Sequence, residues 1–204
     1  MVPHAFIYLA SASPRRRQLL DQIGVVHRPL LADETEDVER LEAEQRGELP
    51  ADYVRRVTLA KLQAARHRLL QRRLPQAPIL CADTTVAAGR HILGKPRSVD
   101  EATAMLRQLS GRTHRVLTAV AVSAGRRTFV DVNVSRVHVA ALSEHSIRRY
   151  VASGEPFGKA GAYAVQGRIA AWIERIEGSY TGIMGLPLFE TARLLARARV
   201  TLDL

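Results

Sequence analysis

The sequence predicts an α/β protein with a mixed sheet and flanking helices, and two observations carry that prediction. Short apolar runs alternate with helix-like stretches in the first half of the chain, as in a sheet covered by helices. Two long β-rich stretches, 114–124 and 128–140, then follow each other across Gly125-Arg126-Arg127, which indicates an antiparallel hairpin. The 204 residues suit one domain with a substantial core, so we expect residues 1–204 to form a single domain.

The N-terminal segment predicts a strand, a tight turn and a helix in succession. Residues 5–10 form a short apolar run that contains aromatic residues and is typical of a buried strand. Ser13 suits the N-cap of a helix and Pro14 its first turn, and Gly24 is placed to end that helix.

The next elements follow from similar signals. The acidic stretch 31–50 predicts a loop with some helix, and 52–74 predicts a long helix that Pro75 stops. Residues 78–82 predict a buried strand with Asp83 at its end, followed by a hairpin turn at Gly89-Arg90.

The remaining elements are marked by caps and turns. Ser98 and Glu101 have the spacing of a capping box for a helix through Leu109, and Ser143 suits the cap of another. In the second hairpin strand the apolar positions change parity, which predicts either a bulge near Ser135 or burial of both faces. Strands are expected at 162–165 and 171–176, and a last helix over 187–195.

The composition narrows the function classes. The net charge of +10 is compatible with nucleic-acid binding or with a solvated arginine-rich surface. Aromatic residues are only 5% of the chain, too few for extensive base stacking, so the solvated surface is favoured. A single cysteine excludes an intramolecular disulfide, and neither a membrane span nor an export signal is evident, so we expect a cytoplasmic protein.

The segment Ser11-Ala12-Ser13-Pro14-Arg15-Arg16 is the first candidate for chemistry. It lies where a strand turns into a helix, so it offers free backbone N–H groups and the positive end of a helix dipole. Its hydroxyls and guanidiniums suit a polyphosphate. A capped helix with solvent-facing arginines is the alternative.

Further candidates lie in three other segments. Asp83, followed by Thr84, could bind Mg²⁺ or activate water at the end of a strand, and Lys95 could reach a phosphate. The acidic loop with Asp33, Glu34 and Glu36 could supply a second metal ligand, although a solvated loop is the commoner explanation. Lys159, Tyr163 and Gln166 lie in a glycine-bracketed stretch that could contact a base edge; an ordinary edge strand is the alternative.

Other patterns are absent or structural. The sequence has no zinc-ligand spacing, Walker loop, dinucleotide fingerprint or Gly-x-Ser-x-Gly elbow. Cys81 lies within an apolar run and is expected to be buried and inert, and Trp172 and His114 are expected to be structural.

Six ordered motifs together resemble the Maf family. They read LASASPRRRQLL (9–20), ADTTV (82–86), LGKP (93–96), LSGRTHRVLTAVAV (109–122), GEPFGKAGAYAVQG (154–167) and GSYTGIMGLPLFET (178–191). The resemblance implies two α/β lobes around a central cleft, and a nucleoside triphosphate pyrophosphatase that uses Mg²⁺ or Mn²⁺. The form of the last two motifs is similar to the subgroup that acts on dTTP and UTP, and a homodimer is expected from the family.

The resemblance also assigns roles. It implies Asp83 as the catalytic residue and, with Glu34, as a metal ligand. It implies substrate contacts by Ser11, Ser13, Arg15, Arg16, Thr84, Lys95, Lys159 and Gln166.

The chain also departs from the family pattern. Gln63 stands where a lysine is expected, and Lys61, two residues earlier, should face elsewhere on a helix, which predicts the loss of one phosphate contact. Gly158 and Gly182 replace a common aspartate and a common asparagine. The alternatives to a dTTP/UTP pyrophosphatase are a family member acting on a modified nucleotide such as 7-methyl-GTP, an inactive regulatory protein, and a nucleic-acid-binding module without turnover.

Overall fold

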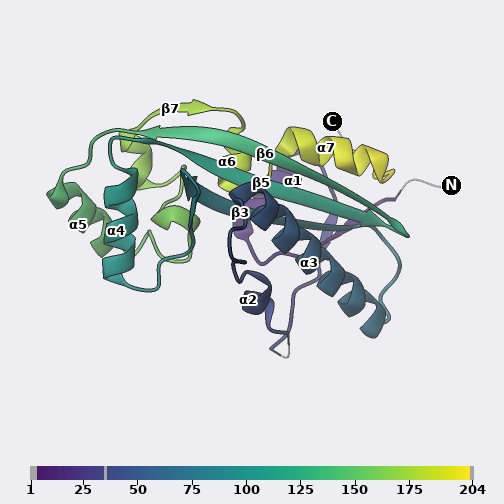
Figure 1. The fold of residues 1–204 in the computed structure, drawn as a ribbon. Helices are drawn as coiled ribbons and strands as arrows, with labels where there is room; N and C mark the ends of the chain where they lie inside the picture. The colour runs from purple at the N-terminus through teal and green to yellow at the C-terminus, as the bar shows by residue number, and fades with distance from the viewer. Residues whose placement is uncertain (1–3, 35, 203–204) are drawn as a thin grey trace.

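A computed structural model describes residues 4–34 and 36–202 as one mixed sheet with helices on both faces (Figure 1). The strands lie in the order β2-β1-β3-β5-β6-β7, and β4 pairs with β3. They span Ile7–Leu9 (β1), His27–Pro29 (β2), Ile79–Ala88 (β3), His91–Leu93 (β4), Thr113–Ala124 (β5), Arg127–Val139 (β6) and Ile173–Glu177 (β7). β1 is parallel to β2 and β3, and the other pairings are antiparallel, so the predicted mixed sheet is confirmed.

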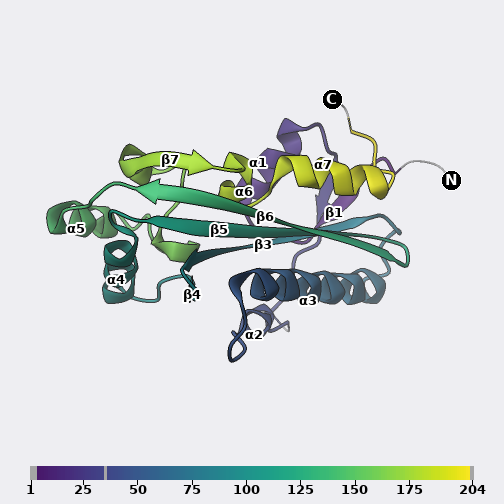
Figure 2. The ribbon, with the colours of Figure 1, turned by 45° about the horizontal axis from the view of Figure 1, so that its top comes forward.

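The helices cover different parts of this sheet. They span Pro14–Gln22 (α1), Val38–Leu41 (α2), Pro50–Gln71 (α3), Val99–Leu109 (α4), Glu144–Ala152 (α5), Tyr180–Met184 (α6) and Leu188–Arg197 (α7), with 3-10 turns at Ala160–Ala162 (η1) and Arg168–Trp172 (η2). Figure 2 shows α3 below the long strands and α1, α6 and α7 above them. Of the helices in the described part of the chain, none is both long and apolar enough to cross a membrane.

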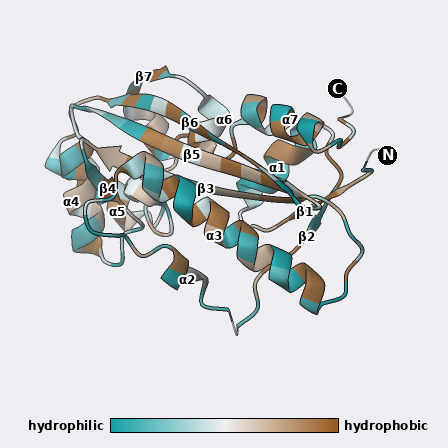
Figure 3. Cartoon of the chain, turned by 45° about the vertical axis from the view of Figure 1, so that its right-hand side comes forward, coloured by the Kyte–Doolittle hydropathy of each residue, from teal (hydrophilic) through white to brown (hydrophobic). Residues whose placement is uncertain are grey.

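Separate apolar clusters build two lobes on the shared strands. At one end, Ile7, Leu20 and Leu194 pack on the α1 and α7 side, while Tyr8 and Leu62 pack on the α3 side. At the other end a third cluster joins α4, α5 and η1 to the strands. Figure 3 shows the resulting pattern, with hydrophobic central strands and mixed colouring along α3. The two-lobed prediction is confirmed.

The parity change in β6 reflects a change in the face that is covered. Its pairing with β5 runs without a break through Ser135, so the predicted bulge is absent there; the described register shift lies between His138 and Val139, in the pairing with β7. Val130 and Val132 pack on the α3 side, whereas Val137 is buried on the opposite face in the second lobe. The strand therefore places apolar side chains on both faces, as the second alternative predicts in part, since Val130 and Val132 are only partly buried and Val134 is exposed.

Most predicted helix boundaries are confirmed at their caps. Ser13 is the N-cap of α1, although its side chain makes no capping hydrogen bond. Ser98 Oγ accepts from the Glu101 N–H at 3.1 Å, while the Glu101 carboxylate accepts from the Arg97 N–H instead of that of Ser98. The Ser143 cap is also confirmed, since its Oγ accepts from the Ser146 N–H.

The strand expected at 162–165 is wrong. Gly161 and Ala162 both have left-handed backbone angles (φ 67° and 61°), which end η1 and prevent an extended run. A Cβ on Gly161 would lie 2.8 Å from the Val86 side chain, so close packing on β3 requires glycine there. The segment is therefore an irregular loop pressed against the sheet. The strand expected at 171–176 is β7, shifted by two residues at its start.

The position of Asp83 also differs from the prediction. It lies in the middle of β3, because the β-branched Thr84, Thr85 and Val86 continue the strand after it. Asp83 nevertheless lies just beyond the end of a neighbouring strand. β1 pairs with β3 only as far as Leu80, and β4 pairs with β3 only from Val86 onward. Among the described strands none pairs with residues 81–85 on this side, which leaves a gap in the sheet.

Cys81, His114 and Trp172, which were expected to be structural or inert, lie as predicted. Cys81 and His114 are buried, and Trp172 is partly buried. Cys81 is buried in β3, and burial raises the pKa of its thiol to about 12, so it is protonated and inert at neutral pH. Trp172 is partly buried against the second lobe's core. His114 is buried, and its Nε2 lies 2.6 Å from the Tyr163 hydroxyl. Its Nδ1 has no hydrogen-bond partner among the described residues.

Burial lowers the pKa of His114 from its ordinary 6.5 to about 4, which predicts a pH-dependent stability. The unfolded chain binds a proton at pH 4–6.5 that the folded protein does not, so the free energy of unfolding should decrease as the pH falls through this range, by about 3 kcal/mol in total. Urea unfolding at several pH values measures it. His114→Gln should flatten the dependence, and His67→Gln, at an exposed position, should not; equal slopes in all three proteins would contradict the assignment.

Candidate functional site

The gap in the sheet opens into a cavity of about 710 Å³ between the two lobes. Among the described strands none pairs with residues 81–85 on the β1 side of β3, so both faces of the strand reach this space: Asp83 faces α3, and Thr84 faces the α1 and α6 side. The cavity is lined by residues from both lobes. They include the predicted site residues Ser11, Ser13, Arg15, Arg16, Asp83, Thr84, Lys95, Lys159 and Gln166. The structure thus brings together every predicted site residue except Glu34.

Arg16 holds one wall of the cavity together. Its guanidinium donates to the Gly185 carbonyl at 2.8 Å, to Ser11 Oγ at 3.0 Å and to Thr84 Oγ1 at 3.5 Å. Burial lowers the pKa of this guanidinium, and the nearby Asp83 carboxylate opposes the shift. Three of its five N–H groups are already used within the protein, so Arg16 organises this wall.

The neighbouring arginine is less constrained. Arg15 makes one hydrogen bond, to the Met184 carbonyl at 3.3 Å. Arg15 and Ser13 lie at the N-terminus of α1, where backbone N–H groups and the helix dipole favour an anion.

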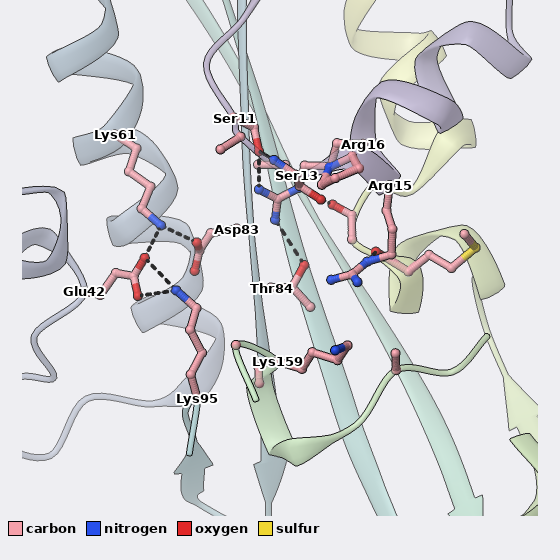
Figure 4. Close-up of a pocket in the computed structure, with 18 of the residues that line it drawn as sticks. Ser11, Ser13, Arg15, Arg16, Glu42, Lys61, Asp83, Thr84, Lys95 and Lys159 are labelled. Atoms are coloured by element: carbon pink, nitrogen blue, oxygen red, sulfur yellow. Dashed lines mark hydrogen bonds and ion pairs between the residues drawn. The ribbon is translucent and has the colours of Figure 1, made fainter. Parts of the chain in front are cut away.

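Four charged groups form a cluster on the opposite wall (Figure 4). The Lys61 ammonium lies between two carboxylates, 2.5 Å from Asp83 Oδ1 and 2.6 Å from Glu42 Oε1. Lys95 reaches the other oxygen of Glu42 at 3.1 Å. Burial alone would lower the pKa of Lys61, but the charges of Asp83 and Glu42 raise it above its ordinary value. Burial would likewise raise the pKa of Glu42, and the two lysines lower it. Both Lys61 and Glu42 are therefore ionised at neutral pH.

Glu42 is held in place through its main chain. The Tyr53 hydroxyl donates to the Glu42 carbonyl at 2.9 Å, and Arg56 donates to the carbonyls of Leu41 and Ala43 on either side. Arg56 is itself paired with Glu48 at 2.6 Å. The segment after α2 is therefore fixed to α3, and its carboxylate points toward Asp83.

The third side of the cavity comes from the second lobe. Lys159 donates to the carbonyls of Glu155 and Phe157 and contacts no carboxylate within hydrogen-bonding distance among the described residues. Gln166 lies exposed at the rim, in a turn closed by a hydrogen bond from the Gly167 N–H to the Ala164 carbonyl.

The carboxylates singled out at the start of the acidic stretch, Asp33, Glu34 and Glu36, lie apart from this cluster. Glu34 is exposed and does not line the cavity, Glu36 pairs with Arg68, and Asp33 pairs with Arg72. The assignment of Glu34 as a metal ligand stays a prediction. Glu42, which the sequence did not single out, is the carboxylate that accompanies Asp83.

Comparison with known proteins identifies the family of this chain. The family described as Maf-like protein matches residues 6–198. The chain belongs to the Maf family.

Curated relatives match over nearly the whole chain. A dTTP/UTP pyrophosphatase of Polaromonas is 61% identical over 95% of this chain and 96% of its own length. Proteins of the same name from Cupriavidus pinatubonensis and Albidiferax ferrireducens are 58% and 60% identical over 97% and 93% of this chain, and over 98% and 95% of their own lengths. Among solved structures, the Staphylococcus aureus Ham1 protein superposes with a TM-score of 0.41 at 14% identity, over 66% of this chain and 71% of that one.

Gln63 and Lys61 do lie on different faces of α3, as expected. Gln63 is exposed and lines a separate groove with His67 and Leu70. Lys61 faces the cavity, together with Ala64 and Arg68 at helical spacings of three and seven. A lysine of α3 is therefore present at the cavity, and the loss of a phosphate contact at Gln63 stays a prediction.

Gly182, which replaces an asparagine common in the family, has a structural reason. Gly182 packs against β6, where a Cβ would lie 2.9 Å from Asn133 Oδ1. The Asn133 amide donates to Glu190 and its oxygen accepts from Ser135. An asparagine on β6 occupies the space beside α6, and the helix residue is correspondingly small. Gly158 lies at the cavity with a left-handed φ of 72°.

Replacing Arg16 by lysine should destabilise the fold measurably. A lysine keeps the charge but cannot donate to three segments as the planar guanidinium does, so we expect the free energy of unfolding to fall by about 1–3 kcal/mol. Urea unfolding of Arg16→Lys against Arg17→Lys, an exposed neighbour on the same helix, measures this. Equal midpoints for the two variants would show that the three contacts do not stabilise the wall.

Proposed function

We propose that this protein hydrolyses dTTP and UTP to the monophosphate and pyrophosphate. The observation that carries the proposal is the Asp83 carboxylate in the sheet gap, paired with Lys61 at 2.5 Å and facing a cavity with further cations from both lobes. Membership of the Maf family and the names of the curated relatives support the same activity.

The cavity suits a nucleoside triphosphate in size and charge. A volume of about 710 Å³ lies within the usual range for small-molecule sites. Arg15, Lys95 and Lys159 extend into it from separate elements and would offset the charge of the phosphates. The dipole of α1 acts in the same direction.

The chemistry of the donor set fits a divalent metal ion. The Lys61 ammonium shows that the space between Asp83 and Glu42 accommodates a cation. Mg²⁺ commonly uses one or two carboxylates and completes its shell with water and substrate phosphates. Consistently, the described residues contain no group of three or more His, Cys, Asp or Glu side chains able to hold a metal. Asp83 with Glu42, or with the predicted Glu34, would hold the ion, which would supply charge neutralisation on the phosphates.

The protein's own residues would then perform the reaction. Lys61 fixes the orientation of the Asp83 carboxylate, so that its other oxygen would accept the proton of the attacking water. The water oxygen forms a bond to the α-phosphorus as the bond to the bridging oxygen breaks. Pyrophosphate leaves with its charge stabilised by the lysines and by Arg15. Gln166 at the rim offers both a donor and an acceptor, as the edge of uracil or thymine requires.

Asp83 is the proposed general base, and its replacement tests the proposed function directly. We expect metal-dependent pyrophosphate release from dTTP and UTP in preference to purine triphosphates, and a decrease of at least about 10²-fold in turnover for Asp83→Asn, because a general base typically contributes that much. Pyrophosphate release across a nucleotide panel measures both. Asp100→Asn, at an exposed position on α4, is the matched control. Near-normal turnover by folded Asp83→Asn would remove Asp83 from this role, and no release from any nucleotide by the unmodified protein would refute the proposed function.

Either Glu42 or Glu34 could be the second carboxylate that holds the metal ion with Asp83, and replacing each of them separates the two possibilities. Because Glu42 already faces the same ammonium as Asp83, we expect Glu42→Gln to raise the Mg²⁺ concentration for half-maximal activity by about tenfold, the effect expected on losing one charged ligand contact. Glu34→Gln should change it less. Metal titrations of both variants at saturating nucleotide test this. A larger change in Glu34→Gln would identify Glu34, and not Glu42, as the second carboxylate.

A further inference from the structure

The turn that carries Gln166 is fixed by a carboxylate outside the cavity lining. Glu155 lies between α5 and the loop of the second lobe, and both of its oxygens accept from the Arg168 N–H, at 3.0 and 3.2 Å. The Tyr150 hydroxyl donates to Glu155 Oε1 at 2.9 Å from the buried face of α5. Glu155 therefore connects helix α5 to the backbone two residues beyond Gln166.

The close approach of Glu155 leaves no room for a side chain at the next position of the turn. A Cβ on Gly167 would lie 1.9 Å from Glu155 Oε1, so this contact requires glycine there. The Gly167 N–H closes the turn on the Ala164 carbonyl at 2.8 Å. The end of the four-residue turn is thus attached to the tyrosine–carboxylate pair through the Arg168 N–H and the close contact at Gly167.

The main chain of Glu155 serves the phosphate side of the cavity as well. Its carbonyl accepts from the Lys159 ammonium at 2.5 Å. One residue therefore sets the position of both the lysine and the glutamine that the second lobe contributes.

We propose that Glu155, held by Tyr150, is a positioning residue that determines base selectivity by fixing the Ala164–Gly167 turn and with it the Gln166 amide. This inference rests on the proposed function. An exposed side chain on a free loop would sample many orientations and would distinguish bases poorly, whereas a fixed turn presents the amide in one direction. Losing the attachment should therefore affect recognition of the base more than the chemistry at the α-phosphorus.

The test compares kcat and KM for dTTP, UTP and two purine triphosphates. In Glu155→Ala we expect KM for dTTP to rise and the preference for pyrimidines to fall about five- to tenfold, the factor that one or two lost hydrogen bonds represent, with kcat within about threefold. Gln166→Ala should show the same change, and the double variant should add little to it. Glu144→Ala, which removes an exposed carboxylate from the neighbouring helix α5, is the matched control.

Two milder variants keep the test valid if Glu155→Ala folds poorly. Tyr150→Phe removes a single contact and should shift the preference in the same direction by a smaller factor. Glu155→Gln retains an acceptor oxygen for the Arg168 N–H and should restore most of the preference. A merely structural role would lower the active fraction for all nucleotides equally and leave their ratio unchanged.

The outcomes distinguish this inference from the proposed function. If the unmodified protein prefers pyrimidines and the preference survives in Glu155→Ala and Tyr150→Phe, the positioning role is wrong while the function stands. If it falls in both variants but Gln166→Ala keeps it, Glu155 positions some other group and the inference as stated is wrong. If the unmodified protein shows no turnover or no base preference, the proposed function and this inference are both overturned.

Discussion

The Arg16 guanidinium connects three parts of the chain that are far apart in sequence: the turn after β1, the middle of β3 and the segment after α6. A guanidinium withdrawn from water needs its donors satisfied, and here each partner is an oxygen placed by a different element. The carbonyl of Gly185 and the hydroxyls of Ser11 and Thr84 can meet one planar group only when the first and last elements pack on the same face of the sheet. The shape of the cavity wall depends on this one side chain.

The second constraint is the length of β1. Because this strand pairs with β3 only as far as Leu80, the sheet is open at residues 81–85, and alternate side chains of one strand face one cavity. A carboxylate and a hydroxyl on consecutive residues, Asp83 and Thr84, therefore serve opposite walls. A β1 longer by two or three residues would cover the gap and separate the lysine cluster from the arginine wall.

Local signals in the sequence were sufficient for most elements and for most of the cavity residues. Caps such as Ser98 and Ser143 and the hairpin at Gly125 act through neighbours in the chain, so their outcomes followed from residue type and spacing. Asp83 was found through its motif, although the strand continues past it. Glu42 was missed because no local pattern marks it: its position is set by Tyr53 and Arg56 on another helix. Lys61 was not singled out because the functional face of α3 was taken to be that of Gln63, whereas the face with Lys61, Ala64 and Arg68 lines the cavity. The loop 162–165 depended on packing against Val86, which is a long-range contact.

The cations around the cavity differ in how fully the protein already uses them. Arg16 has three internal acceptors, and Lys61 lies between two carboxylates, so both have fixed positions before any ligand binds. Arg15 has a single long hydrogen bond, Lys159 contacts only backbone carbonyls, and the half-exposed Lys95 shares Glu42 with Lys61. An incoming anion has little to gain from the first pair, because displacing a partner leaves a buried charge unpaired. The second set can exchange neutral or shared partners for phosphate oxygens at small loss. The structure thus distinguishes cations fixed by several internal partners from cations with weaker or shared partners, and the net charge of +10 by itself makes no such distinction.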